Sequence, residues 1–140
     1  MHKILLGEIM NDNVVLNPFM ISIDLESPIT VEKNNPIPFF QIEIDKLKTI
    51  IYDSKTSYFK FKEVGDYYIK YQFKTDKTYH ISLQGNMKYF EADSFPVIHS
   101  SHGSGIITVE KPDNFFYFTC VDENIKLMEG KTIVTIFKVK

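Results

Sequence analysis

Apolar and polar residues alternate along much of the chain, which is typical of β-strands with one buried face. The pattern is clearest in residues 67–74. One face of that segment carries Tyr67, Ile69, Tyr71 and Phe73, and the other carries Tyr68, Lys70, Gln72 and Lys74. Further strands are predicted at 20–25, 39–44, 58–62, 78–86, 105–110, 114–122 and 131–140. No segment keeps apolar residues at helical spacing over three turns, so the pattern predicts an all-β protein.

Turn residues punctuate these segments. Gly65 in the sequence EVGD predicts a hairpin between 58–62 and 67–74. Gly85-Asn86 and the sequence KPDN at 111–114 predict turns further along the chain. Many short strands at regular spacing indicate a sandwich or barrel. We therefore predict one domain over residues 1–140, with 1–17 as a loose N-terminal segment.

Two strands are apolar on both faces. In the first, Phe115, Tyr117 and Val121 oppose Phe116, Phe118 and Cys120, and in the second, Ile133, Phe137 and Val139 oppose Val134 and Ile136. A sandwich buries only its inner faces, so the outer residues predict a second layer or a subunit contact. A chain of 140 residues leaves little for a second layer. We expect an oligomer with Tyr58, Val134 and Ile136 at or near the contact, opposite the core-facing side of their strands.

Composition narrows the class of protein. Apolar residues make up 44% and charged residues 24%, as in ordinary globular proteins and unlike disordered ones. The net charge is −2, and all 16 basic residues are lysine, which disfavours specific nucleic-acid binding because arginine is the residue of choice for it. No apolar run is long enough to cross a membrane, and the first residues do not resemble a signal peptide. We expect synthesis in the cytoplasm.

Four segments in this order resemble the C1q/TNF-like jelly-roll family. They are ITVEKNNPIPF, FKFKEVGDYYIKYQF, YHISLQGN and GSGIITVEKPDNFFYFTCVDENIKLMEGKTIVTIFKVK. In particular they resemble the bacterial branch found at the tips of collagen-like filaments on spore surfaces and in related exosporium proteins. The resemblance covers roughly residues 18–140. Two features depart from the family: the turn after GIITV is Lys-Pro-Asp-Asn where Gly-Asp is frequent, and no collagen-like Gly-x-y repeat occurs.

The resemblance implies an all-β, ten-stranded jelly-roll sandwich that forms a compact homotrimer. It also implies a structural or binding role without catalysis and without a cofactor. Because the collagen-like repeat is missing, this chain would be a free-standing head. Assembly on a spore, cell or phage-particle surface is the hypothesis that the resemblance adds.

The stretch IHSSHGSG, residues 98–105, holds two histidines at a spacing that metals use. In the resembled family this segment connects into a strand, so we interpret His99 and His102 as loop residues and expect Gly103 and Gly105 to allow positive φ. A zinc site needs three or four ligands, and the remaining histidines, His2 and His80, lie elsewhere in the sequence. We predict no metal, with a site completed by a threefold axis or by Asp93 as the alternative.

Other chemistry has weaker support. A cupin, the main enzymatic jelly roll, needs a His-x-His pair and a later histidine, and none follows His102. Loop carboxylates at Asp113, Asp122 and Glu123 are conceivable calcium ligands, but their spacing matches no calcium loop. Cys120, the single cysteine, is interpreted as a small buried hydrophobe in place of a reactive thiol. No Gly-x-Ser-x-Gly or phosphate-binding loop is present.

Two functional hypotheses remain. The first is a non-catalytic trimeric structural or adhesive head on a spore, cell or phage particle. The second is a soluble ligand-binding module for a carbohydrate or protein. An apolar threefold contact without a pocket would favour the first hypothesis, and a group of surface aromatic residues would favour the second.

Overall fold

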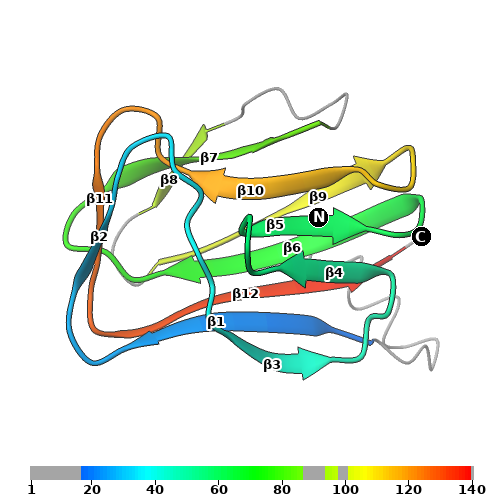
Figure 1. Ribbon diagram of the computed structural model, residues 1–140, viewed down its shortest axis with the longest axis horizontal. Helices are drawn as coiled ribbons and strands as arrows, with labels where there is room; N and C mark the ends of the chain where they lie inside the picture. The colour runs from blue at the N-terminus through cyan, green and yellow to red at the C-terminus, as the bar shows by residue number, and fades with distance from the viewer. Residues whose placement is uncertain (1–16, 87–93, 98–100, 140) are drawn as a thin grey trace.

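Two five-stranded antiparallel sheets stack face to face in the computed structural model (Figure 1), which describes residues 17–86, 94–97 and 101–139. The first sheet has the strand order β3 (Gln41–Asp45), β1 (Phe19–Leu25), β12 (Gly130–Lys138), β6 (Gly65–Phe73) and β9 (Ser101–Val109). The second has the order β4 (Ile50–Asp53), β5 (Tyr58–Phe61), β10 (Phe115–Thr119), β7 (Tyr79–Gly85) and β8 (Ser94–Val97). Strands β2 (Ile29–Val31) and β11 (Ile125–Leu127) pair separately. The described residues contain no helix, so the all-β, ten-stranded jelly-roll prediction is confirmed.

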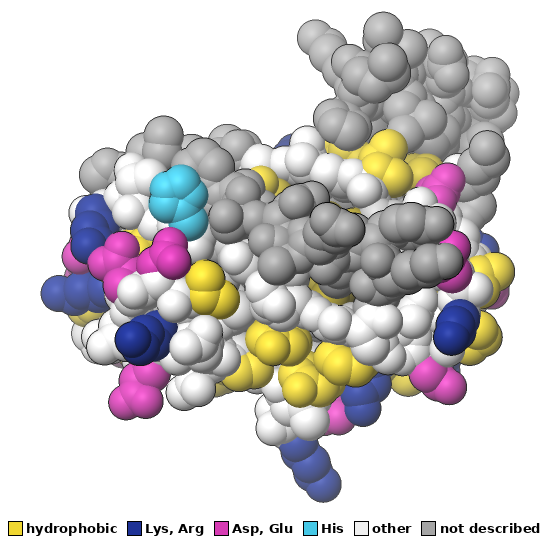
Figure 2. Space-filling view, turned by 90° about the horizontal axis from the view of Figure 1, so that it is seen from above, with side chains coloured by type: hydrophobic (Ala, Val, Ile, Leu, Met, Phe, Trp, Pro, Cys, Tyr) yellow, Lys and Arg dark blue, Asp and Glu magenta, His cyan; other side chains and the backbone are white. Residues whose placement is uncertain are grey.

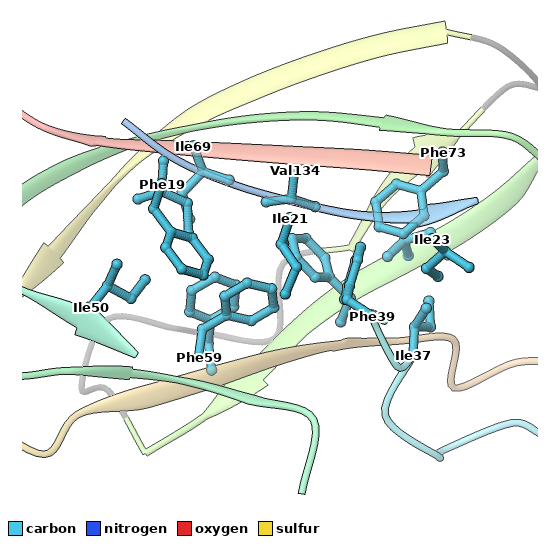
Figure 3. Packing of buried hydrophobic residues seen from close by; sticks show 14 of the residues in the cluster. Phe19, Ile21, Ile23, Ile37, Phe39, Ile50, Phe59, Ile69, Phe73 and Val134 are labelled. Atoms are coloured by element: carbon cyan, nitrogen blue, oxygen red, sulfur yellow. The ribbon is translucent and has the colours of Figure 1, made fainter. Parts of the chain in front are cut away.

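The hydrophobic core lies between the two sheets. Figure 3 shows Phe19, Ile69 and Val134 pointing from the first sheet toward Phe59 of the second. The Phe59 ring stacks on Phe116 with 4.8 Å between ring centroids. Each of these side chains is at most 2% exposed. Burial of an apolar side chain of this size stabilises the fold by about 1.5–3 kcal/mol, so this aromatic interior holds the sheets together.

The segment between β2 and β3 also reaches into the core. Phe39, 2% exposed, packs edge-to-face on Phe59 at 5.6 Å and on Phe118 at 6.1 Å. The Phe39 backbone N–H donates to the Tyr52 hydroxyl at 2.8 Å, and burial raises the pKa of Tyr52. Because that phenol stays protonated, it remains a stable partner for the backbone of this irregular segment.

The predicted hairpin at Gly65 is wrong. Strand β5 pairs with β4 and β10, whereas β6 pairs with β12 and β9, so the chain crosses from the second sheet to the first between them. Gly65 has a φ of 146°, a conformation that glycine adopts without strain. The turn residue was identified correctly, but a glycine turn serves a crossover between sheets as well as a hairpin within one.

The orientation predicted for Val134 and Ile136 is also wrong. Both side chains are fully buried in the core of the protomer. Ile136 lies opposite Phe19 on one side and Ile69 on the other, and both of these neighbours are core residues. Both faces of β12 are apolar, so the sequence pattern alone does not indicate which face points inward. The register with β1 and β6 decides it, and neither residue is available for a subunit contact.

The stretch with two histidines differs from the loop that we expected. Residues 101–109 form β9, and among the described glycines only Gly65 and Gly130 have positive φ. His102 lies in this strand opposite Gln72, whereas His99 lies outside the described residues. Gly103 lies opposite Tyr71, and a Cβ atom added there would come within 2.1 Å of the Tyr71 ring. The glycine is needed because the ring occupies the space above it.

Candidate functional site: the outer faces of the two sheets

The sandwich leaves one outer face on each sheet, and register shows which side chains share it. Residues directly opposite each other on neighbouring strands point to the same side. On the first sheet Phe137 lies opposite Tyr68, and Tyr68 lies opposite Ile106. These three residues, which we name the apolar row, cross strands β12, β6 and β9 on the side away from the core. A row across three strands forms a continuous surface.

The apolar row is closely packed at its centre and open at one end. Tyr68 is only 5% exposed, Phe137 is half-buried, and Ile106 is 42% exposed. The Tyr68 and Phe137 ring centroids are 6.4 Å apart. Ile133, also half-buried, lies four positions before Phe137 on the same face. The first outer face therefore carries more aliphatic and aromatic surface than a solvated sheet needs.

One carboxylate near this face is held in place. Glu43 accepts a hydrogen bond from the Ser22 hydroxyl at 2.7 Å and pairs with Lys131 at 3.1 Å. The Ser22 hydrogen bond, with Lys131 as a second cause, lowers the pKa of Glu43. Ser22 lies opposite Ile133, so the ionised, neutralised carboxylate borders the apolar surface.

The second outer face carries three aromatic rings, Tyr58, Phe115 and Tyr117, which we name the aromatic stack. Tyr58 packs on Phe115 with ring centroids 4.4 Å apart and planes 7° apart, and on Tyr117 at 5.1 Å and 15°. Each residue is half-buried. Phe115 and Tyr117 share one face of their strand, as predicted, and the burial of Phe116 and Phe118 shows that this face points away from the core. The predicted outward orientation of Tyr58 is confirmed as well, but its role at a subunit contact stays a prediction.

Polar side chains surround the aromatic stack. By register, Lys60 lies opposite Phe115, Asp53 opposite Tyr58, and Gln84 opposite Tyr117. Lys60 and Asp53 form an ion pair at 2.9 Å. The hydrogen bond from Lys60, with one from the Lys55 backbone N–H as the second cause, lowers the pKa of Asp53. The cation and anion next to the rings therefore neutralise each other.

The predicted chemical residues are scattered. Cys120 is 2% exposed, which confirms its interpretation as a buried hydrophobe. Asp113 occupies a left-handed turn position with φ of 74°, and Glu123 forms an ion pair with Lys77 at 2.6 Å. No group of three or more His, Cys, Asp or Glu side chains within the described ranges could hold a metal ion. The calcium candidates are not brought together.

The most strongly shifted phenol is structural. Tyr79, 2% exposed, donates to Asp76 at 2.6 Å and accepts from the Lys126 backbone N–H at 3.2 Å. Burial, reinforced by the hydrogen bond to Asp76, raises the pKa of Tyr79 to about 12. The phenol therefore remains protonated at neutral pH and links β7 to β11.

The sequence pattern puts Tyr68 on the face opposite Tyr67 and Ile69 but indicates no function for it. It puts Phe137 on the core-facing side of its strand, which is wrong, because Val134 and Ile136 are the buried residues. The available signal was an aromatic residue among lysine and glutamine on one face of residues 67–74. Ile106 was missed because its neighbours on the same face come from β6, and register across strands is not visible in the sequence. The described part of the chain contains no helix that could cross a membrane.

No family model and no curated protein matches the sequence. Several solved structures do match this chain in fold. The globular domain of zebrafish complement 1qA protein superposes with a TM-score of 0.68 at 15% identity, covering 89% of this chain and 98% of that one. The chain has a C1q/TNF-like jelly-roll fold. The Eiger TNF from S. frugiperda matches with a TM-score of 0.61 at 10% identity, over 88% of this chain and 92% of its own. PRD1 vertex protein P5 matches with a TM-score of 0.60 at 12% identity, over 90% of this chain and 99% of its own.

Proposed function

We propose that this protein is a non-catalytic, homotrimeric head domain with a structural or adhesive role on a spore, cell or phage-particle surface. The apolar row on the outer face of the first sheet is the observation that carries the proposal. Phe137 and Ile106 keep part of their apolar surface exposed on either side of Tyr68, which is itself only 5% exposed. Burying each exposed side chain of this kind is worth about 1.5–3 kcal/mol, and a symmetric assembly repeats each contact in every subunit.

A second copy of the chain is the occupant that fits this face. Permanent subunit contacts are richer in apolar side chains than transient ones. Glu43 is already paired with Lys131, so the face can be covered without stranding that carboxylate. Asp66 and Lys70 flank Tyr68 on the same face of β6 and would lie at the border of the contact. The C1q/TNF-like fold supports a threefold arrangement, as the resemblance in the sequence implied.

The chemistry of the described residues supports a role without catalysis. Asp53, Glu43 and Glu63 are each engaged in an ion pair with a lysine. The phenol with the largest pKa shift, Tyr79, is shifted away from ionisation and bonded to the fold. Its environment is that of a structural anchor and not of a proton donor to a substrate. The similarity in fold to a vertex protein supports a place on a particle surface.

The mass in solution tests this proposal. Light scattering at micromolar concentration should give three times the chain mass of 16.4 kDa. The mass should not change when the salt concentration is raised, because the contact is apolar and not electrostatic. A parent protein that runs as a monomer at micromolar concentration would overturn the trimer.

A further inference from the structure

The aromatic stack has chemistry that the trimer proposal does not use. It lies on the second sheet, on the far side of the sandwich from the apolar row. A trimer closed through the first sheet would leave this face in solvent. The three aligned rings would therefore remain open to a ligand.

The polar groups beside the rings are either uncharged or paired with an opposite charge. The hydroxyls of Tyr58 and Tyr117 and the amide of Gln84 form no hydrogen bond with any other residue that the structure describes. The two charged neighbours, Lys60 and Asp53, are paired with each other. A ligand on this face would thus meet two phenols and an amide, with no net charge to attract an ion. In the view from above in Figure 2, lysine and acidic side chains lie close to one another.

The rings are also held in position before any ligand arrives. Tyr58 packs nearly parallel to both Phe115 and Tyr117, and the three residues still keep part of their surface in solvent. Side chains that are already ordered lose little conformational entropy on binding. Aromatic surface interspersed with a few neutral hydrogen-bonding groups suits a ligand that has both apolar C–H surface and hydroxyl groups.

We propose that the aromatic stack, with Gln84 beside it, binds a neutral polysaccharide. The ring faces that pack on one another within the stack are closed to a ligand, so the C–H surface of a sugar ring would pack on the aromatic surface that remains exposed. Its hydroxyls would meet the phenols and the amide. A protein partner fits less well, since a stable protein contact covers roughly 800 Å² on each side and the three rings are bounded by polar side chains. This inference deepens the adhesive part of the proposed function and names the class of ligand.

The test uses native affinity electrophoresis of the full chain in gels containing hydroxyethyl cellulose, laminarin, galactomannan or dextran, with anionic alginate as the charged comparison. We expect at least one neutral polysaccharide to retard the parent. Tyr58→Ala and Phe115→Ala should weaken that retardation at least tenfold. Phe40→Ala is the matched control, because Phe40 is a ring with 67% exposure near the edge of the other sheet, and it should bind like the parent.

Binding can be distinguished from folding with variants that retain all three rings. Tyr117→Phe and Gln84→Ala each remove one neutral polar group and should weaken binding by about twofold to tenfold, with an unchanged melting temperature. The inference is overturned if none of the four neutral polysaccharides retards the parent, if alginate alone does, or if Tyr58→Ala binds as well as the parent. A change of assembly mass in a folded Tyr58→Ala variant would overturn it too, because a second copy would then occupy this face.

Mass measured on the same samples distinguishes this inference from the trimer proposal. A monomeric parent that is still retarded keeps the polysaccharide site and removes the trimer. A trimeric parent that is retarded by none of the neutral polysaccharides keeps the trimer and removes the polysaccharide site.

Discussion

The outer faces of the two sheets carry aromatic rings of the same kind in different surroundings. On the first sheet Tyr68 and Phe137 continue into Ile106, so the rings belong to a surface with aliphatic groups. On the second sheet the direct neighbours of Tyr58 and Tyr117 include an amide and a closed ion pair, and one exposed aliphatic residue, Ile51, lies beyond Lys60. Aromatic residues alone therefore do not indicate the role of a surface. Aliphatic neighbours favour a permanent contact, and neutral polar neighbours favour an exchangeable ligand.

The largest effect is expected from a charge on the inner side of β12. Ile136→Asp places a carboxylate in the core beside Phe19 and Ile69. A buried charge without a partner costs on the order of 4 kcal/mol or more, which is a large part of the stability of a typical domain. Circular dichroism should show an unfolded chain. A variant that stays folded with the melting temperature of the parent would contradict the assignment of Ile136 to the core-facing side of β12.

The next largest effect is expected at β9, where it tests which side of the strand faces the core. Gly103→Ala should destabilise the fold by about 1–3 kcal/mol, because the new Cβ meets the Tyr71 ring, which packs on Phe73 and Phe118. Gly105→Ala is the matched control, since nothing lies within 4 Å of its Cβ position. Its stability in urea should be unchanged or raised by up to about 1 kcal/mol. Equal losses in both variants would mean that Ile106 does not belong to the outer face.

A smaller effect separates the two faces by its dependence on concentration. Phe115→Ala removes one ring of the aromatic stack and should cost about 0.5–1.5 kcal/mol from the lost ring packing, in addition to the burial of the ring, independent of protein concentration. Phe137→Ala should lower the melting temperature more strongly in dilute samples, because a subunit contact is lost by mass action. Differential scanning fluorimetry over a hundredfold range of concentration measures both. The same concentration dependence in the two variants would remove the distinction between the faces.

The smallest effect concerns the ion pair beside the aromatic stack. Lys60 holds the pKa of Asp53 below its ordinary value of 3.8, so the pair stabilises the fold above that value and its contribution is lost as the pH falls below it. Lys60→Met should therefore melt slightly below the parent near neutral pH, and the difference should vanish in acid. A difference that grows in acid would contradict this sign.

Strand positions could be predicted from the sequence because single strands carry their own signal. The alternation at 67–74 places Tyr67, Ile69 and Phe73 inward, as the structure does. The short strands β4, β8 and β11 do not stand out in the pattern, because their three or four residues lack the clear alternation that Phe59 and Phe61 give to the equally short β5. Local patterns therefore indicate where strands lie but not how they pair.

The candidate site was harder to predict because it depends on pairing. β12 is apolar on both faces, and only its register with β1 and β6 directs Val134 inward and Phe137 outward. Tyr58 was placed outward correctly, since Phe59 and Phe61 clearly define the inner side of its strand. Its stacking on Phe115 and Tyr117 arises from residues more than fifty positions away in the sequence, which no local pattern reveals.

The most direct test measures, by sedimentation equilibrium, the masses of two variants that each carry one new aspartate on one of the outer faces. Phe137→Asp and Tyr117→Asp both substitute a half-buried aromatic residue, one on the first sheet and one on the second. With a parent of three times 16.4 kDa, Phe137→Asp should sediment as a folded monomer and Tyr117→Asp as a trimer. A trimeric Phe137→Asp, or a monomeric Tyr117→Asp, would contradict the assignment of self-association to the first sheet.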